Sequence, residues 1–320
     1  MNGGWASEVR SVQPGGGAGA WLARIWGRAR RAWLRRLHPH RVAALAAART
    51  GDCPNCSHDV LDGRDLVWVR NVCRVDFLPS HTVSPFRDAF GLVRLGRPEL
   101  ALAALLGLGL AALGFWLLPP LAGLAVLPPA FACWFFRDPE RPAPSSRDCV
   151  LAPADGVLDD VRQEASCPYF AGPALRLGIY LSLFDVHVQR APVVGRVGAC
   201  SFHRGARTRT VRRGHTDGNE HIATTFVTEN GTPVAVRQIA GPFASRVCSV
   251  LRVGEQLRAG DRFGMVKFGS RCEVWLPAGS LAAVLPRLGS RVRAGVTVLG
   301  MLACVAGQAP VTSTRAAPSG

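Results

Sequence analysis

Three segments of the sequence carry residue types that together could activate a weak nucleophile. They are residues 151–156 with Asp155, residues 182–192 with His187, and residues 263–271 with Ser270. In such a set, the histidine takes the proton of the serine hydroxyl and the aspartate orients the histidine. Each segment also has a purely structural interpretation: a turn, a hydrogen-bonded histidine at a strand end, and a strand kink. These residue types are common in proteins, so the set alone does not choose between the two interpretations.

The composition narrows the class of protein. The chain has 320 residues, 48% of them hydrophobic, which favours a membrane segment joined to a folded body. Its formal net charge of +16 favours anionic partners such as phospholipid surfaces, nucleic acids or acidic substrates. Lys267 is the only lysine, and this excess of arginine is also typical of the codon bias of a GC-rich genome. The ten cysteines are mostly spread singly, which predicts reduced thiols rather than a disulfide framework.

Residues 100–136 contain no charged side chain and predict a helical hairpin in the membrane. Leu100 to Leu118 is long enough to cross a bilayer, which takes a helix of ~20 residues, and Pro119-Pro120 interrupts it before a second apolar run. Arginines flank both ends of the stretch, at Arg94, Arg97, Arg137 and Arg141. By the positive-inside rule both ends lie in the cytoplasm, so the hairpin crosses or dips into the membrane and returns. The alternative is a pair of buried helices in a soluble core.

Residues 1–74 predict a basic N-terminal extension that is partly disordered. Trp21 to Arg49 interleaves apolar side chains with many arginines, so it is either a basic amphipathic helix on a membrane or an unstructured extension. Cys53 and Cys56 have the spacing of half a zinc knuckle. Further potential ligands follow at His58, Cys73 and His81. A zinc site usually has a second closely spaced ligand pair, which this stretch of sequence does not contain, so we predict no metal.

From Val150 onward, short β-forming runs alternate with Gly and Pro. The predicted strands are residues 175–183, 222–227, 234–239, 247–251, 265–268 and 272–276. We therefore predict a mainly β (α+β) fold, with a compact β domain at 138–320 after a membrane-associated segment at 75–137. Val253–Gly260 and Leu288–Gly295 repeat a motif with the form of the hammerhead hairpins in lipoyl- and biotinyl-carrier folds. Neither copy contains the lysine that such carriers modify, so we expect the shape without the function.

The three segments, together with residues 135–141, resemble the phosphatidylserine decarboxylase proenzymes. The motifs that carry the resemblance are F-F-R-D-P-E-R, P-A-D-G, D-V-H-V-x-R-A-P and F-G-S-R. They occur in the family's order between about Phe77 and about Gly300. They are most similar to the short bacterial and archaeal branch, which includes archaetidylserine decarboxylases. Residues 1–74 lie outside the resemblance.

The resemblance implies that the chain cuts itself between Gly269 and Ser270. Glycine suits this position because, without a Cβ, its backbone can strain and its carbonyl can be approached closely. Ser270 Oγ attacks that carbonyl and converts the amide into an ester. Loss of the Ser270 α-proton eliminates the ester, and the resulting dehydroalanine hydrolyses to a pyruvoyl group with release of ammonia. The products are a β chain of residues 1–269 and an α chain of residues 270–320, which form a heterodimer.

A pyruvoyl cofactor made from Ser270 would supply the electron sink that an amino-acid decarboxylase needs when CO2 departs. Pyridoxal phosphate would need a lysine, and Lys267 lies only three residues before the cut. The resemblance implies a carboxy-lyase that converts phosphatidylserine to phosphatidylethanolamine. Its catalytic residues are then Ser270, His187 and Asp155. An archaeal ether lipid is the alternative substrate.

One position departs from the family's pattern. Long-branch members have two histidines in the second segment; the first matches His187, and Arg190 occupies the position of the second. In that branch the second histidine is implicated in cleavage and the first in decarboxylation, and an arginine cannot act as a base at ordinary pH. Either His187 serves both steps or another histidine supplies the base. The candidates are His203, His215 and His221.

Four residues are candidates for substrate binding. Arg137 lies at the exit of the hairpin, where it either binds a lipid phosphate or simply places its charge at the membrane surface. Arg190 either binds a carboxylate or phosphate of the substrate or pairs with a nearby acid. Asn219 and Glu220 resemble a family segment near the active site.

Two non-enzymatic interpretations compete with this one. A membrane-anchored, lipoyl-like binding module is disfavoured by the missing lysine and by the presence of Gly269-Ser270. A nucleic-acid-binding protein is disfavoured because the sequence has no aromatic stacking platform or recognised motif. The sequence therefore predicts an enzyme that acts on an anionic phospholipid at the cytoplasmic face of the cell membrane, with no nucleic-acid partner.

Overall fold

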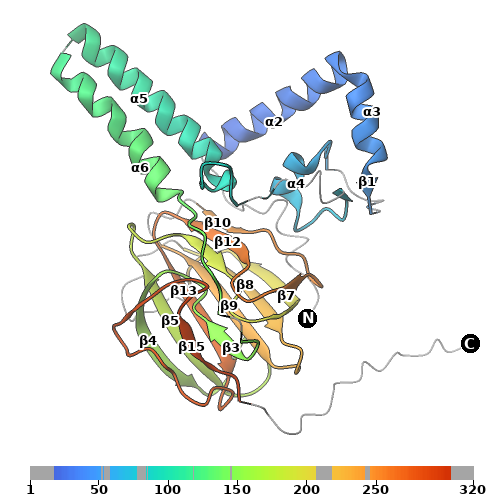
Figure 1. The fold of residues 1–320 in the computed structure, drawn as a ribbon, viewed down its shortest axis with the longest axis vertical. Coiled ribbons are helices and arrows are strands. Elements are labelled where there is room, and N and C mark those ends of the chain that lie inside the picture. The colour runs from blue at the N-terminus through green and yellow to red at the C-terminus, as the bar shows by residue number, and fades with distance from the viewer. Residues whose placement is uncertain are drawn as a thin grey trace, which may run out of the picture.

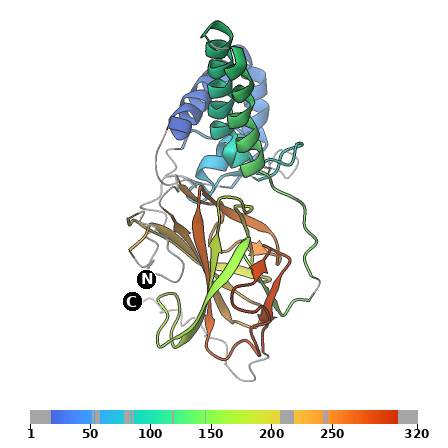
Figure 2. The same ribbon diagram turned by 90° about the vertical axis from the view of Figure 1, so that its left-hand side faces the viewer.

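The structure is a computed structural model that describes residues 18–51, 53, 58–77, 84, 86–117, 119–144, 146–206, 218–241 and 246–303. Within these residues, helices gather at one end of a β body (Figures 1 and 2). Most of the regular structure after residue 140 is strand. The prediction of a mainly β fold with some helices is therefore confirmed.

The β body is built around an antiparallel sheet of eight strands. In spatial order they are β11 (Gln256–Leu257), β7 (Gly195–His203), β8 (His221–Val227), β9 (Pro233–Ala240), β13 (Ser270–Pro277), β5 (Ala174–Leu181), β4 (Gly156–Glu164) and β14 (Arg291–Val292). A three-stranded sheet contains β10 (Arg246–Ser249), β12 (Arg262–Lys267) and β6 (Val188–Arg190). Two further pairs are β3 (Cys149–Leu151) with β15 (Val298–Met301) and β1 (Arg49–Thr50) with β2 (Asp76–Phe77). Strands β10 and β12 lie at the end of the β body that faces the helices (Figure 1).

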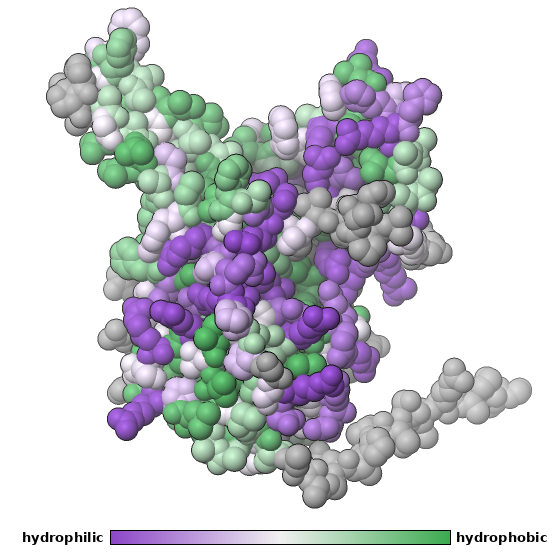
Figure 3. Space-filling model, viewed as in Figure 1, coloured by the Kyte–Doolittle hydropathy of each residue, from purple (hydrophilic) through white to green (hydrophobic). Residues whose placement is uncertain are grey.

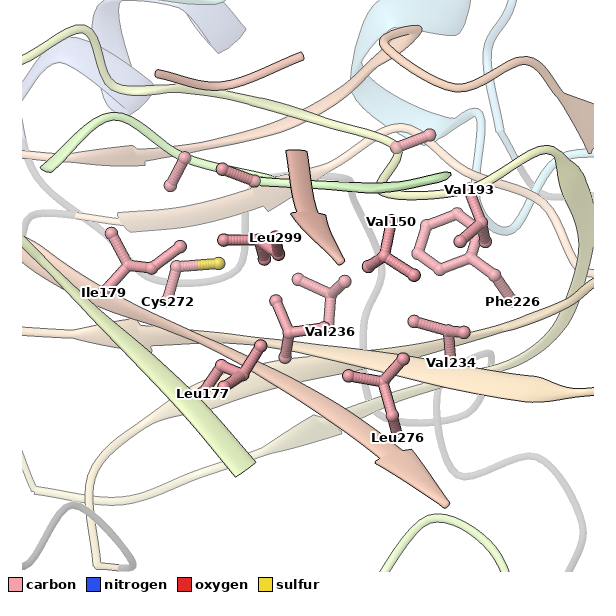
Figure 4. Close-up of a cluster of buried hydrophobic side chains, with 14 of the residues drawn as sticks. Val150, Leu177, Ile179, Val193, Phe226, Val234, Val236, Cys272, Leu276 and Leu299 are labelled. Atoms are coloured by element: carbon pink, nitrogen blue, oxygen red, sulfur yellow. The ribbon is translucent and has the colours of Figure 1, made fainter. Parts of the chain in front are cut away.

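The main hydrophobic core lies on the inner face of the large sheet. Every second residue of the central strands points into it, including Leu177, Ile179, Val234, Val236, Cys272 and Leu276 (Figure 4). Because side chains alternate along a strand, Ser270 lies on the same inner face of β13 as Cys272. Arg271 lies on the opposite face.

The two copies of the repeated motif occupy matching places at the two edges of the large sheet. Val253–Gly260 contains β11, which pairs with β7, and Leu288–Gly295 contains β14, which pairs with β4. Both glycines of each copy have positive φ: Gly254, Gly260, Gly289 and Gly295. The repeat in the sequence is therefore also a repeat in backbone conformation and strand pairing.

The apolar stretch forms a helical hairpin. A 3₁₀ turn η2 (Arg94–Gly96) leads into α5 (Arg97–Leu117), and η3 (Pro119–Val126) and α6 (Leu127–Phe135) return. Gly114 lets the two arms approach closely, since a Cβ there would lie 2.6 Å from the backbone nitrogen of Ala122. Among the described residues, the helix at 94–117 is the one that is long and apolar enough to cross a membrane. The hairpin surface is mostly apolar (Figure 3), which is compatible with membrane association.

Residues 21–49, for which the sequence left two interpretations open, are helical over most of their length. They lie in α2 (Ala18–Leu37) and α3 (Pro39–Ala47), and α4 (Gly63–Val69) follows. Asp62 and Asp65 form a capping box at the start of α4. Arg30 of α2 pairs with both of these aspartates, which joins α2 to α4.

The N-terminal helices are also tied to the β body. Arg252 pairs with Asp76 at 3.1 Å and donates to the carbonyl oxygens of Arg70 and Val75. Arg70 in turn pairs with Glu255 at 2.9 Å. This part of the extension is therefore docked on the domain that carries the candidate site.

Candidate active site

The peptide bond between Gly269 and Ser270 lies at a turn between two strands. β12 ends at Lys267 and β13 begins at Ser270, so Phe268 and Gly269 form the turn. Both have positive φ, 66° at Phe268 and 76° at Gly269. Among the described residues, Phe268 is the only non-glycine residue in this region of φ, which is strained for a side chain with a Cβ. The backbone immediately before the predicted cut is therefore strained.

Two groups contact the backbone of Gly269 from different parts of the chain. The Gly269 N–H donates to Nε2 of His187 at 3.4 Å. The Gly241 N–H donates to the Gly269 carbonyl oxygen at 3.2 Å. A donor at this oxygen stabilises the negative charge that develops there when the carbonyl carbon is attacked. In the residue that follows Gly269, Ser270 Oγ is buried and has no hydrogen-bond partner among the described residues.

His187 is held as a neutral imidazole with its acceptor nitrogen toward the scissile segment. Its Nδ1 lies 2.8 Å from the carbonyl oxygen of Asp185, which can only accept, so Nδ1 carries the proton. The ring is fully buried and packs against Phe135 at 4.4 Å, and Phe135 stacks on Phe268. Burial lowers the pKa of His187 to about 4, because desolvation of the imidazolium outweighs the hydrogen bond to Asp185. His187 is therefore ready to accept a proton at neutral pH.

The lowered pKa of His187 predicts how self-cleavage depends on pH. The rate should stay constant on acidification through pH 6.5, the ordinary value for histidine, and fall only as the pH approaches about 4. Stability should fall as the pH drops from ~6.5 to about 4, because the unfolded chain binds this proton below pH ~6.5 and the folded chain only near 4. The measurement is the rate at which newly made chain separates into two bands on a denaturing gel. An acid limb centred near 6.5 would show that His187 is not the base or is not buried.

Asp155 lies just before β4 and contacts Arg141 rather than a histidine. Arg141 donates to both carboxylate oxygens of Asp155, from Nη1 to Oδ1 and from Nη2 to Oδ2, the latter at 2.8 Å. The backbone N–H of Ala294 donates to it at 2.8 Å. No described histidine donates the expected hydrogen bond to Asp155. Arg141 and Ala294 donate to Asp155 instead, and the Asp185 carbonyl oxygen accepts from His187. Asp155 acts on His187 only through its charge, which slightly favours the imidazolium.

Two of the alternative histidines lie on the wrong face of the sheet to activate Ser270. The strand register places His221 in the same cross-strand row as Arg271, on the face opposite Ser270. His203 pairs with His221, and their rings stack at 4.5 Å. His215 lies outside the described residues.

Arg137 lies where the hairpin meets the site. It donates to the carbonyl oxygens of Trp134 at 2.7 Å and Phe184 at 2.8 Å, and its guanidinium lies over the Trp134 ring. Both acceptors are neutral carbonyl oxygens, so these contacts orient the guanidinium without neutralising its charge. Arg137 is two residues from Phe135, which packs on His187.

Arg190 is buried and engaged within the protein. It donates to Asp138 at 3.3 Å and to the carbonyl oxygens of Pro139 and Gly260. Asp138 is shared with Arg262, at 2.6 Å. Of the two interpretations of Arg190, pairing with a nearby acid matches this geometry, and direct binding of substrate does not.

Asn219 and Glu220 lie just before β8, and β9 separates β8 from the strand that begins at Ser270. The Asn219 side-chain amide donates to the carbonyl oxygen of Ala240 at 2.9 Å, and the Glu220 carbonyl accepts from the Ala240 N–H at 2.9 Å. Ala240 is the cross-strand neighbour of Ser270. These two residues are therefore in place to support the strand that flanks Ser270.

A family model of phosphatidylserine decarboxylase matches residues 129–300, more than half of the chain. The chain belongs to the phosphatidylserine decarboxylase family. The matched region includes the end of α6, His187, and the Gly269–Ser270 peptide.

The relatives that match over most of their own length include three phosphatidylserine decarboxylase proenzymes. The one from Symbiobacterium thermophilum is 43% identical over 182 residues, which cover 57% of this chain and 82% of the relative. The one from Rhodopirellula baltica is 38% identical over 215 residues, 67% of this chain and 89% of the relative. The one from Burkholderia lata is 37% identical over 218 residues, 66% of this chain and 96% of the relative.

Two features of this decarboxylase-family site were not predicted from the sequence. The Gly241 donor carries no sequence signal, since any residue can offer a backbone N–H. The second is Lys267, whose fully buried ammonium donates to Glu99 at 2.8 Å and to the Leu95 carbonyl oxygen at 2.8 Å. Its signal was available, because a single lysine in an arginine-rich chain stands directly before the strained turn.

The possible zinc ligands are only partly described. Cys73 is buried in an apolar cluster with Leu66, Val75 and Phe77, and Cys53 packs against that cluster. Cys56 and His81 lie outside the described residues. The apolar surroundings of Cys73 favour a packing role for this thiol.

Proposed function

We propose that the chain is a self-processing proenzyme that becomes a pyruvoyl-dependent carboxy-lyase and converts phosphatidylserine to phosphatidylethanolamine and CO2. Its family, and the proenzyme name of its relatives, support this reaction. The observation that carries the proposal is the convergence of His187 Nε2 and the Gly241 N–H on the backbone of Gly269, beside the buried hydroxyl of Ser270. The family names point to the ester lipid rather than the archaeal ether lipid.

Cleavage begins with a nitrogen-to-oxygen acyl shift. Ser270 Oγ attacks the Gly269 carbonyl carbon as its proton moves to His187 Nε2, and the Gly241 N–H holds the oxyanion. The C–N bond then breaks, and His187 returns the proton to the Ser270 nitrogen, which leaves an ester and a free amine. Relief of the positive-φ strain at Phe268 favours this step.

Elimination and hydrolysis complete the maturation. A base removes the Ser270 α-proton, and the C–O bond breaks to release the Gly269 carboxylate. The remaining enamine tautomerises, adds one water and loses ammonia, which leaves a pyruvoyl group at position 270. We propose that His187 serves both cleavage and decarboxylation, because it is the described histidine that contacts the scissile segment.

The residues around position 270 fit a pyruvoyl group, which would supply an electron sink for the electrons left by CO2. Position 270 faces inward beside a neutral, buried histidine that can hold and deliver a proton. Arg137 stands at the membrane side of the same site and would bind the lipid phosphate through its retained charge. Asp155, through Arg141, would position the segment that follows the hairpin.

We propose that the hairpin lies in the cell membrane, with the catalytic domain on the cytoplasmic face. The base of the hairpin belongs to the site, since Phe135 packs on His187 and Phe268. A phospholipid headgroup at the membrane surface would therefore meet Arg137 and position 270 without leaving the bilayer. The arginines at both ends of the hairpin support this orientation.

The strand pairing supports a stable heterodimer after the cut. β13 starts at Ser270 and is hydrogen-bonded along its length between β5 and β9, both of which belong to residues 1–269. β14 and β15 of the same chain pair with β4 and β3. We propose the division into an extension at 1–74, a membrane segment at 75–137 and a catalytic domain at 138–320. The repeated motifs within it would have the hammerhead shape of lipoyl carriers without their modification.

A variant of Lys267 tests whether the hairpin positions the strained turn. Lys267→Met should slow self-cleavage and lower stability by ~3–5 kcal/mol, because it leaves Glu99 with its main ion pair broken in a mostly buried place. Lys267→Arg should restore much of the cleavage rate if the ion pair matters, and Lys267→Met with Glu99→Gln should restore stability. The cleavage half-life is measured well below the melting temperature. If Lys267→Met cuts itself at the wild-type rate, the ion pair between Lys267 and Glu99 does not position the turn.

Release of CO2 from phosphatidylserine tests the reaction directly. The purified protein in mixed micelles should form phosphatidylethanolamine and CO2 in equal amounts. An ether-linked serine lipid is assayed in parallel. Product from the ether lipid alone would overturn the assignment of the ester substrate, and product from neither would overturn the proposed reaction.

A further inference from the structure

Helix α2 carries an apolar stripe that is exposed in the described part of the chain. Trp21, Ile25, Trp33 and Leu37 are separated by multiples of four residues, and Trp26 lies beside Trp33, seven residues away. The three tryptophans are 59%, 73% and 52% exposed in chain order. Single exposed apolar residues are ordinary, but five along one helix form a patch that marks an interaction surface.

The opposite side of α2 is fixed against the protein, so the stripe cannot simply turn inward. Leu34 is buried. Arg30, Arg31 and Arg35 pair with aspartates just before α4 and in its first turn: Asp59, Asp62 and Asp65. These ion pairs set the rotation of α2 about its axis and leave the tryptophans facing outward.

The chemistry of the stripe matches the surface of an anionic bilayer. The 20 residues of α2 include no Asp or Glu, and Arg28 and Arg36 are exposed along with the tryptophans. Tryptophan favours the boundary between headgroups and acyl chains, and arginine favours anionic headgroups. Basic helices with a tryptophan-rich apolar face lie in the plane of this boundary.

The position of α2 matches the same surface. α2 contacts α5 of the hairpin, and the two project from the same end of the β body (Figures 1 and 2). A bilayer that receives the hairpin therefore comes within reach of α2. The stripe would then extend the apolar surface of the hairpin rather than form a separate site.

We propose that α2 is a second membrane-binding element, which lies in the headgroup region of an anionic bilayer beside the inserted hairpin. This inference goes beyond decarboxylation and rests on only one part of the proposed function, the membrane placement of the hairpin. It gives the N-terminal extension, which lies outside the family match at 129–300, a role in holding the enzyme on its substrate surface.

Quenching of tryptophan fluorescence by brominated lipid tests this proposal with the full chain. The protein is placed in nanodiscs of phosphatidylcholine and phosphatidylglycerol, with brominated or ordinary acyl chains. Wild type is compared with a variant that carries Trp21→Phe, Trp26→Phe and Trp33→Phe, which keeps the stripe apolar. The matched control is Trp275→Phe, because Trp275 is buried in the β body.

The expected result has opposite signs in the two variants. Removing lipid-facing tryptophans lowers the quenched fraction of the remaining fluorescence, whereas removing buried Trp275 raises it. A rise in the α2 variant would show that these tryptophans do not meet lipid and would overturn the proposal. A change from dimer to monomer on Trp26→Ser in detergent would also overturn it, since the stripe would then join two copies.

Activity measured on the same samples separates this inference from the proposed function. The α2 variant should still cut itself and release CO2, because its three substitutions lie outside the catalytic domain. If the quenched fraction falls in the α2 variant as expected but the protein never releases CO2, the membrane contact of α2 is supported and the decarboxylase proposal fails.

Discussion

Ser270→Ala should leave the protein as one full-length chain that releases no CO2 from phosphatidylserine. The substitution removes the hydroxyl that attacks Gly269 and the atom from which the cofactor would be made, so both activities should disappear together. Little else changes, because Ser270 Oγ has no hydrogen-bond partner among the described residues. The measurements are a denaturing gel and CO2 release from the same preparation.

A second buried serine provides the control for this variant. Ser280 is also buried, with a side-chain oxygen that has no partner among the described residues, but it lies after β13 and away from the turn. Ser280→Ala should cut and decarboxylate normally. Ser270→Cys keeps a nucleophile and should cut slowly, with little pyruvoyl formed. Two bands from Ser270→Ala would place the cut elsewhere.

His187→Ala should slow self-cleavage by roughly 10²- to 10⁴-fold, the usual contribution of a general base. The variant should therefore remain mostly uncut, and the fraction that does cut should release CO2 slowly. His203→Ala is the matched control, since His203 is exposed on the opposite face of the sheet. It should behave as wild type in both assays.

Other outcomes of His187→Ala would change the account in defined ways. Normal cleavage with no CO2 release would confine His187 to decarboxylation and require another base for the cut. Normal rates in both assays would remove His187 from the mechanism.

The central strands could be predicted from the sequence because they are short β-forming runs bounded by Gly and Pro. The runs at 222–227 and 234–239 became β8 (His221–Val227) and β9 (Pro233–Ala240) with boundaries within a residue. β4 (Gly156–Glu164) was not predicted, because Asp159 and Asp160 in its middle are typical of a polar loop. Those carboxylates are compatible with a strand because Arg271 and Arg176 pair with them across the sheet.

The candidate site could be predicted only where one residue type carries the chemistry. Ser270 and His187 stand in distinctive local motifs, and the fold brings His187 to the Gly269 peptide. The partner of Asp155 could not be predicted, because Arg141 reaches it through a loop whose path depends on the whole fold. The faces of His203 and His221 relative to Ser270 depend on strand register, which is set by pairings between distant segments.

Mass spectrometry of the intact purified protein would show both the cut and the modified terminus. We expect two components, residues 1–269 with an ordinary carboxyl terminus and residues 270–320 with an N-terminal pyruvoyl group. The second should be lighter than the same segment with N-terminal serine by the mass of one ammonia molecule. A single uncut chain, or a second component that begins with an unmodified serine, would contradict the account.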